Sequence, residues 1–436
     1  MSEEKNIYGG VLMKFRPETI AVRGGYNPAD HNGSITVPIY QTNAYQFKDI
    51  EYAKNLFDLK EFGHIYTRIT NPTTAVLEER LCLLEGGVHA VATSSGHFAE
   101  FAAISAIAGS GDEIISSSRL YGGSVNLFNN FFRNLGIKFK IVDQFNLTEL
   151  EEAITEKTKA LFIETISNPS CDVADLEAWS EIAKKHKLPL IVDSSGATPF
   201  LCRPKDFGAD IVIHSLTKYI GGHANSMGGV VIDLGTFDWA GSGRFPSFTE
   251  PNPSYHGLVF AETFGAAAFG VKVRVESLRD AGGCISPQNS FYILQGLETL
   301  HLRMKAHSEN ALELAKFLKA HSKVEWINYP ALEDNKNIER TKKYLKGLGS
   351  GVISFGVKGG LDAAVKVIES LKIAHHVANF ADVRTLVTHP ASTSHRQLSP
   401  EGRKAAGSPD ELIRVSVGIE HFEDIKEDFE QALNNI

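Results

Sequence analysis

The feature that most constrains the fold of this chain is a set of short apolar runs, each followed by a loop rich in Gly, Ser and Thr. Residues 188–229 hold two of them, LPLIVD and ADIVIHS. Runs this short and this rich in Ile and Val are typical of buried parallel strands. Further runs (HAVATSSG, DEIISSS, KFKIVD and KALFIET) alternate with helical patterns. The alternation predicts an α/β fold, with a parallel sheet covered by helices on both faces.

A carboxylate and an amine lie at the carboxyl ends of two neighbouring runs. Asp193 ends LPLIVD, and Lys218 follows ADIVIHS within the segment SLTK, whose Ser215 and Thr217 carry hydroxyls suited to a phosphate. Ligands of parallel sheets bind at the carboxyl ends of the strands. Taken singly, the lysine would be a solvated surface residue and the aspartate a cap or turn residue. Together they match pyridoxal phosphate (PLP), which needs a lysine at its aldehyde and a carboxylate beside its ring nitrogen.

Bulk properties exclude several classes of function. The chain has 436 residues, of which 43% are hydrophobic, which is enough for two or three domains. A net charge of −8 gives no basis for binding nucleic acid or an anionic membrane. We find no apolar run of transmembrane length and no signal peptide in MSEEKNIYGG. Four scattered cysteines predict neither a disulfide framework nor a metal site, so we expect a soluble cytoplasmic protein.

The segment 188–229 resembles the active-site segment of the Cys/Met-metabolism family of fold-type I PLP-dependent enzymes. That resemblance implies a large, mostly parallel sheet domain at 66–290 that binds PLP and carries an insert at about 233–283. A smaller α/β C-terminal domain would follow at 291–436. Residues 1–65, which lack regular periodicity, would form an arm that contacts a neighbouring subunit.

The resemblance assigns two further motifs to the cofactor phosphate. Ser95, Gly96 and His97 form a strand-to-helix turn, where free backbone N–H groups favour an anion. Taken alone, a serine-rich turn is usually a helix cap. Tyr66 and Arg68 would hold the phosphate of the neighbouring protomer, although a lone Tyr-x-Arg triplet is usually a surface feature. The implied assembly is a homo-oligomer, by the family's habit a tetramer, with active sites shared between protomers.

Other matched positions concern the substrate, a small amino acid. Tyr121 would stack on the cofactor ring and assist proton transfer, and Asn168 would donate to the PLP 3-oxygen and the substrate carboxylate. Arg414 lies in the strand-like run LIRVSVGIE, where a buried charge needs an anionic partner. A structural ion pair is one possibility, whereas the resemblance assigns this arginine to the substrate α-carboxylate. Asn379 would be another polar contact to the substrate.

The insert gives the most specific indication of function. It contains NPSYHG, and N-P-x-Y-H-G at this place in the family marks O-acetylhomoserine sulfhydrylases. Such enzymes replace acetate by sulfide to give L-homocysteine for methionine biosynthesis. Lys218 would be the mobile base at the substrate Cα and Cβ, and Asp193 would keep the ring nitrogen protonated. The alternatives are a cystathionine γ-synthase or γ-lyase of the same family and, from another class, a catalytically idle scaffold.

Three departures from the family's usual pattern concern specificity. Ser194-Ser195-Gly196 replaces Asn-Thr-Phe, so Gly196 stands in place of an aromatic residue. His97 stands where Gln or Met is usual, and His223-Ala224-Asn225 replaces His-Gly-Thr. Gly123 stands where methionine γ-lyases usually carry Cys, which argues against that activity. We expect Gly196 to widen the entrance enough to admit a larger sulfur donor, such as a thiol or a sulfur-carrier protein. The sulfur donor and the acyl group, acetyl or succinyl, stay open.

Overall fold

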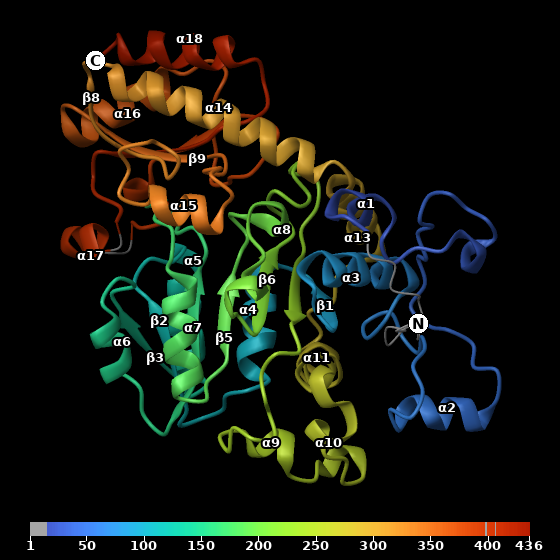
Figure 1. Ribbon diagram of the computed structural model, residues 1–436. Helices are drawn as coiled ribbons and strands as arrows, with labels where there is room; N and C mark the ends of the chain where they lie inside the picture. The colour runs from blue at the N-terminus through green and yellow to red at the C-terminus, as the bar shows by residue number, and fades with distance from the viewer. Residues whose placement is uncertain (1–14, 397–398, 406) are drawn as a thin grey trace.

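Two sheets organise the computed structural model, which describes residues 15–396, 399–405 and 407–436 (Figure 1). The larger has seven strands and the smaller five. In spatial order the large sheet comprises β1 (His89–Thr93), β7 (Gly229–Asp233), β6 (Ile211–Ser215), β5 (Leu190–Asp193), β4 (Thr158–Glu164), β2 (Glu113–Ser117) and β3 (Lys138–Val142). The mostly parallel sheet predicted from the sequence is confirmed.

One strand of the large sheet, β7, was not predicted. It runs antiparallel to both β6 and β1, whereas the remaining neighbours pair in parallel. The physical reason lies in its connection. Residues 216–228 join β6 to β7 without a helix, whereas the crossover that returns a chain in parallel usually contains one. This helix-free loop carries Lys218.

Both faces of the large sheet are buried, since consecutive residues along a strand pack into two different hydrophobic cores. Ala90 and Ala92 pack in one cluster with Leu77 of α3 (Pro72–Glu85), and Val91 packs in the other with Ala99 of α4 (Gly96–Ser105). Strands buried on both faces read as continuous apolar runs, which is why the sequence shows them clearly. The other helices of this region are α5 (Gly122–Asn126), α6 (Leu147–Glu152), α7 (Leu176–Lys185) and α8 (Thr198–Leu201).

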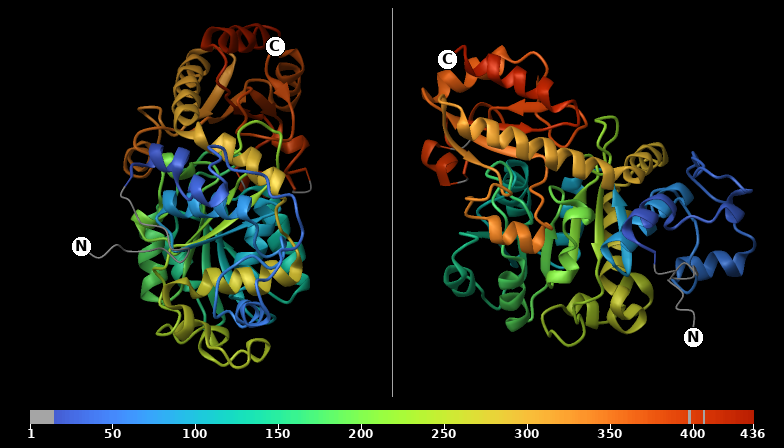
Figure 2. Two further views of the ribbon diagram at one scale, coloured as in Figure 1. Left: turned by 90° about the vertical axis from the view of Figure 1, so that its right-hand side faces the viewer. Right: turned by 45° about the horizontal axis from the view of Figure 1, so that its top comes forward.

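The segment before α3 begins with a helix that packs on α3, and the chain that follows this helix extends away from the body of the molecule (Figures 1 and 2). Its helices are short, α1 (Pro17–Arg23) and α2 (Ile50–Phe57). The insert at 233–283 packs on the large-sheet core through Trp239, whose ring stacks on Phe248 at 4.3 Å and Phe269 at 5.4 Å. Its helices are α9 (Pro246–Thr249), α10 (Phe260–Phe264), α11 (Ala268–Lys272) and α12 (Arg279–Ala281).

The small sheet follows a helical stretch that breaks at Thr299 into α13 (Pro287–Glu298) and α14 (Leu300–Ala320). Its order is β10 (His375–His376), β11 (Leu386–Thr388), β12 (Leu412–Ser416), β9 (Val352–Val357) and β8 (Val324–Asn328). The C-terminal helices are α15 (Ile338–Tyr344), α16 (Gly360–Ser370), α17 (Pro400–Ala405) and α18 (Phe422–Leu433). Helices α14, α16 and α18 pack on one face, and the other faces the large sheet (Figure 1). In the described ranges, no helix is long and apolar enough to span a bilayer.

A buried ion pair ties the first helix of the large domain to its sheet and insert. Glu78 of α3 accepts from the Arg274 guanidinium at 2.8 Å and from the backbone N–H of Ala92 in β1 at 2.7 Å. Arg274 also donates to the carbonyls of Ala90 and Ile69. Removing the carboxylate would take a negative charge and two hydrogen-bond acceptors out of this buried network.

Glu78→Ala should therefore lower the free energy of unfolding by about 3–5 kcal/mol, the range for breaking a buried pair. Chemical denaturation of the purified variant measures this loss. Glu339→Ala is the matched control, because its Lys342 partner is exposed, and we expect a change within about 0.5 kcal/mol. Equal losses in the two variants would contradict a structural role for the buried pair.

Candidate active site

A cavity of about 210 Å³ lies at the carboxyl ends of β4, β5 and β6, where the large sheet meets the small one. The strand ends deliver its polar groups, as the parallel arrangement requires. Sequence-predicted residues that line it are Ser95, Gly96, His97, Tyr121, Asn168, Asp193, Ser215, Thr217 and Lys218. Sequence analysis assigned no role to its other polar lining residues Glu100, Ser124, Glu164, Ser167, Ser195 and Ser350.

The Lys218 amine lies deep in this cavity. Its Nζ donates to Asn379 Oδ1 at 2.6 Å and lies 4.9 Å from the centre of the Phe380 ring. Burial lowers the pKa of Lys218 to about 8, and the nearby Arg414 charge contributes in the same direction. A substantial neutral fraction near physiological pH makes this amine a usable nucleophile.

Arg414 reaches the site from β12 of the small sheet. Its guanidinium donates to Asn168 Oδ1 at 3.1 Å and to the carbonyl of Asn379 at 2.6 Å. In the described part of the chain, it forms no ion pair with a carboxylate. Its Nε and the Nδ2 of Asn168 are buried without a hydrogen-bond partner among the described residues. Burial lowers the pKa of Arg414 to about 10, so this end of the cavity favours an anion such as a carboxylate.

Three carboxyl groups surround the opposite end. Asp193 Oδ1 accepts from the backbone N–H of Ser195 at 2.8 Å, and Glu164 accepts from that of Tyr121 at 2.6 Å. Burial raises the pKa of Asp193, Glu164 and Glu100, and their mutual repulsion adds to the last two. Three neighbouring acids in a dry cavity cannot all ionise. A cation beside Asp193, such as a protonated pyridine nitrogen, would restore its charge.

Glu100 was absent from the residues predicted from the sequence. Its Oε1 accepts from the Ser124 hydroxyl at 2.6 Å, and its Oε2 is buried without a hydrogen-bond partner among the described residues. The signal that could have revealed it is its context. It is the one acidic residue of α4, whose sequence GHFAEFAAIS is otherwise almost wholly apolar.

Backbone packing leaves room for an anion at the start of α4. Ser95 is its N-cap, with Oγ accepting from Phe98 N at 3.1 Å. A Cβ at Gly96 would lie 2.7 Å from that of Ser215, so glycine allows the helix start to approach the end of β6. Helix N-termini present free N–H groups to phosphate. Together with the lysine and Asp193, this turn fits the dimensions and polarity of PLP.

Two aromatic rings form one wall. His97 stacks on Tyr121 with centroids 5.8 Å apart, and a Cβ at Gly123 would lie 2.7 Å from His97 Nε2. Gly123 therefore leaves the space that the imidazole occupies. At Gly196 a Cβ would meet only Ile166, at 3.5 Å, so the structure has room there for a small side chain.

Tyr66 and Arg68 do not reach the cavity of their own chain. Arg68 Nη1 donates to the carbonyl of Arg279, and Tyr66 is 39% exposed. Neither residue lines the cavity. Across the ranges described, no three His, Cys, Asp or Glu side chains gather as a metal-ligand set.

Comparison with known proteins agrees with this geometry. The sequence model for "Cys/Met metabolism PLP-dependent enzyme" matches residues 18–434. The O-acetyl-L-homoserine sulfhydrylase of Leptospira meyeri is 49% identical over 97% of both chains, and the homocysteine synthase of Schizosaccharomyces pombe is 48% identical over 95% of this chain and 97% of that one.

Solved structures show the same fold. An O-acetylhomoserine (thiol)-lyase from Campylobacter jejuni, which contains N'-pyridoxyl-lysine-5'-monophosphate, superimposes with a TM-score of 0.94 at 40% identity, over 96% of this chain and all of the other. Cystathionine gamma-lyase from Lactobacillus plantarum gives 0.83 at 30% identity, over 97% of this chain and 99% of that one. The chain therefore belongs to the family of PLP-dependent enzymes of cysteine and methionine metabolism.

Proposed function

We propose that this chain is an O-acetyl-L-homoserine sulfhydrylase that replaces acetate by sulfide and forms L-homocysteine in methionine biosynthesis. One observation carries the proposal: the Lys218 amine and the Asp193 carboxylate line a single cavity, and the Arg414 guanidinium, which has no acidic partner in the described ranges, donates to Asn168 of that lining. Relatives that are 49% and 48% identical over nearly the whole chain bear the names O-acetyl-L-homoserine sulfhydrylase and homocysteine synthase.

The residues divide the work between cofactor and substrate. Bound PLP supplies an electron-withdrawing ring that stabilises negative charge at the substrate Cα. We assign Lys218 to the cofactor aldehyde and then to proton transfer at Cα and Cβ. Asp193 keeps the ring nitrogen protonated, while Tyr121 covers the ring and assists proton transfer. The phosphate group is assigned to Ser95, Gly96, His97, Ser215 and Thr217.

Arg414 orients the substrate in this scheme. A guanidinium offers a planar pair of donors that matches the two oxygens of the α-carboxylate. Asn168 and Asn379 already contact this guanidinium, so they fix its direction and lie beside the bound carboxylate.

We assign Tyr66 and Arg68 to the active site of a second protomer. This role is supported by their distance from their own cavity and by the exposed apolar residues of the same segment, including Ile35, Ile50 and Phe57. The assembly proposed is a tetramer in the cytoplasm, with residues 1–65 as the contact arm and domains at 66–290 and 291–436.

A second candidate is a cystathionine γ-synthase or γ-lyase activity. It is favoured by the TM-score of 0.83 to cystathionine gamma-lyase, a fold similarity that extends over 97% of the chain. The open space at Gly196 is compatible with a sulfur donor larger than sulfide, either a thiol or the tail of a carrier protein.

The first test is homocysteine formation from O-acetyl-L-homoserine and sulfide by the PLP-loaded enzyme. Lys218→Ala should lower kcat/KM by about 10³-fold or more, because the base and the bond to the cofactor are lost together. Lys157→Ala, which removes an exposed lysine outside the cavity, should leave the rate unchanged. Acetate or ketobutyrate released without homocysteine would favour the lyase, and a preference for O-succinyl-L-homoserine would overturn the substrate.

Incorporation of PLP into cofactor-free protein should depend on pH in a way that reflects the lowered pKa of Lys218. Only the neutral amine attacks an aldehyde, so the rate should rise about tenfold per pH unit below a pH of about 8 and level off above it. Stopped-flow absorbance of the imine measures the rate. Nα-acetyl-lysine amide, whose ε-amine is free, is the control. Its rate should keep rising with pH until the pH reaches the ordinary lysine pKa of 10.5. A protein profile that follows the control would contradict an activated lysine.

Sharing of sites between protomers predicts complementation. Arg68→Ala and Lys218→Ala homo-oligomers should each be nearly inactive. After equal amounts are unfolded and reassembled together, about a quarter of the wild-type activity should return if the sites are shared pairwise, because half the pairs are mixed and each has one intact site. Size-exclusion chromatography checks reassembly, and no recovery in properly assembled mixtures would contradict the proposed role of Arg68.

A further inference from the structure

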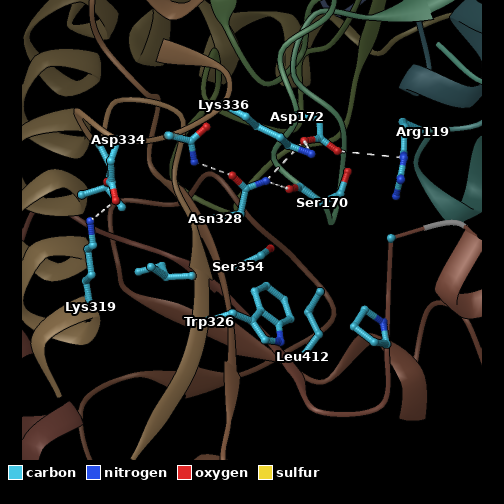
Figure 3. Close-up of a pocket in the computed structure, with 15 residues that line it drawn as sticks. Arg119, Ser170, Asp172, Lys319, Trp326, Asn328, Asp334, Lys336, Ser354 and Leu412 are labelled. Atoms are coloured by element: carbon cyan, nitrogen blue, oxygen red, sulfur yellow. Dashed lines mark hydrogen bonds and ion pairs between the residues drawn. The ribbon is translucent and has the colours of Figure 1, made fainter. Parts of the chain in front are cut away.

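A second cavity, of about 420 Å³, is shown in Figure 3. Its lining residue Leu412 stands two positions before Arg414 on β12, so it lies on the same face of the small sheet as the active site. This volume falls within the range of small-molecule sites. Trp326 and Leu412 lie on one side of it, and Asp172 and Asn328 lie on the other (Figure 3). None of these residues has a role in the reaction proposed above.

Arg119 is the least exposed of the three cations that line this cavity, the others being Lys319 and Lys336. Its Nε is buried without a hydrogen-bond partner in the described part of the chain, and it forms a long ion pair, at 3.9 Å, with Asp172 Oδ2. Asp172 itself is held by Lys336 Nζ at 2.8 Å, and Lys319 is paired with Asp334. A half-buried guanidinium with spare donors favours an anionic ligand.

The other side of the cavity is a fixed aromatic surface. The indole of Trp326 lies over Gly356, where a Cβ would collide with its Nε1 and Cε2 atoms. The same Nε1 donates to Glu411 Oε1 at 3.1 Å, which sets the orientation of the ring. Leu412 and Pro409 continue the apolar wall. A rigid indole of this kind packs well against a flat apolar ligand.

We propose that the second cavity binds a small organic monocarboxylate with a planar apolar body. The carboxylate binds Arg119 and the body packs on Trp326. A single negative charge fits best, because Lys319 and Lys336 have carboxylate oxygens within hydrogen-bond distance, whereas the carboxylate partner of Arg119 is 3.9 Å away. A multiply charged phosphate would meet the carboxylates of Asp172 and Asp334 without enough cations to neutralise it.

The wall between the two cavities contains residues of both. Arg119 stands two positions before Tyr121, and Asn168 stands two positions before Ser170. Asn328 Nδ2 donates to the carbonyl of Ser170 at 2.5 Å. A ligand that moves Arg119 or Asn328 therefore acts on the segment that positions Asn168. Binding in the second cavity is thereby coupled to the active site.

Calorimetric titration of the PLP-loaded enzyme with 3-phenylpropionate tests the site. Acetate, which lacks the apolar body, and 3-phenylpropanol, which lacks the charge, should each bind at least about tenfold more weakly. Saturation should also change the emission of Trp326, the one tryptophan that lines the cavity, and Trp326→Phe should abolish that change. Equal affinity for 3-phenylpropanol, or absence of saturable binding, would overturn the proposal.

Substitutions of the cations in the second cavity test which of them contacts the ligand carboxylate. Arg119→Gln should weaken 3-phenylpropionate binding at least about tenfold, whereas Lys319→Gln, which removes a cation already paired, should change it less than about twofold. If the glutamine variant does not fold, Arg119→Lys keeps the charge but loses the planar fork, and affinity should still fall. Unchanged affinity in a folded Arg119 variant would contradict the site.

Coupling is tested by the KM for O-acetyl-L-homoserine, which should change at least about fivefold at saturating 3-phenylpropionate. The KM measurement rests on the proposed function, whereas calorimetry does not. Failure of the proposed function can therefore be distinguished from failure of ligand binding in the second cavity. A constant KM in an enzyme that binds the probe would refute coupling. Loss of the KM effect in Arg119→Gln would support it.

Discussion

The buried Arg414 guanidinium is the charge on which the geometry of the active site depends. It projects from the small sheet and donates to Asn168 on the large-sheet side and to the carbonyl of Asn379. Leaving such a charge buried without a counter-ion is costly, and burial already lowers its pKa to about 10. A carboxylate ligand relieves that cost. Substrate binding and the alignment of the two sheets therefore both depend on the same buried charge.

The cavity is polarised because its two ends belong to different sheets. Arg414, from the small sheet, makes one end positive, and its charge adds to the effect of burial in lowering the pKa of Lys218. Strands β4 and β5 and helix α4 place Glu164, Asp193 and Glu100 at the other end, where burial raises each pKa. A cofactor with a cationic ring nitrogen and a substrate with a carboxylate complement these two ends. Neither end would be favourable without its ligand, which is typical of a site preorganised for binding.

The features that could be predicted from the sequence are those that depend on local sequence pattern. Strands with apolar runs buried on both faces were recognisable, and Asp193 and Lys218 were placed together because parallel strands end at one edge. Glu100 was missed because its contact with Ser124 joins two segments that no periodicity links. The second cavity was unpredictable for the same reason, since Arg119, Asp172 and Trp326 come from three separate segments. The partner-facing role proposed for Arg68 rests on the family resemblance, because a Tyr-x-Arg triplet by itself is typical of a surface feature.

Strand geometry explains why two cavities share one face of the small sheet. Leu412 and Arg414 are two residues apart on β12, so their side chains point to the same face. Ser354 pairs with Arg414 on one side and with Asn328 on the other, which places it between the cavities. Its hydroxyl donates to the carbonyl of Pro169, next to Asn168. Any tilt of the small sheet therefore moves Arg414 and the floor of the second cavity together, and a ligand that favours one tilt in either cavity changes the affinity of the other.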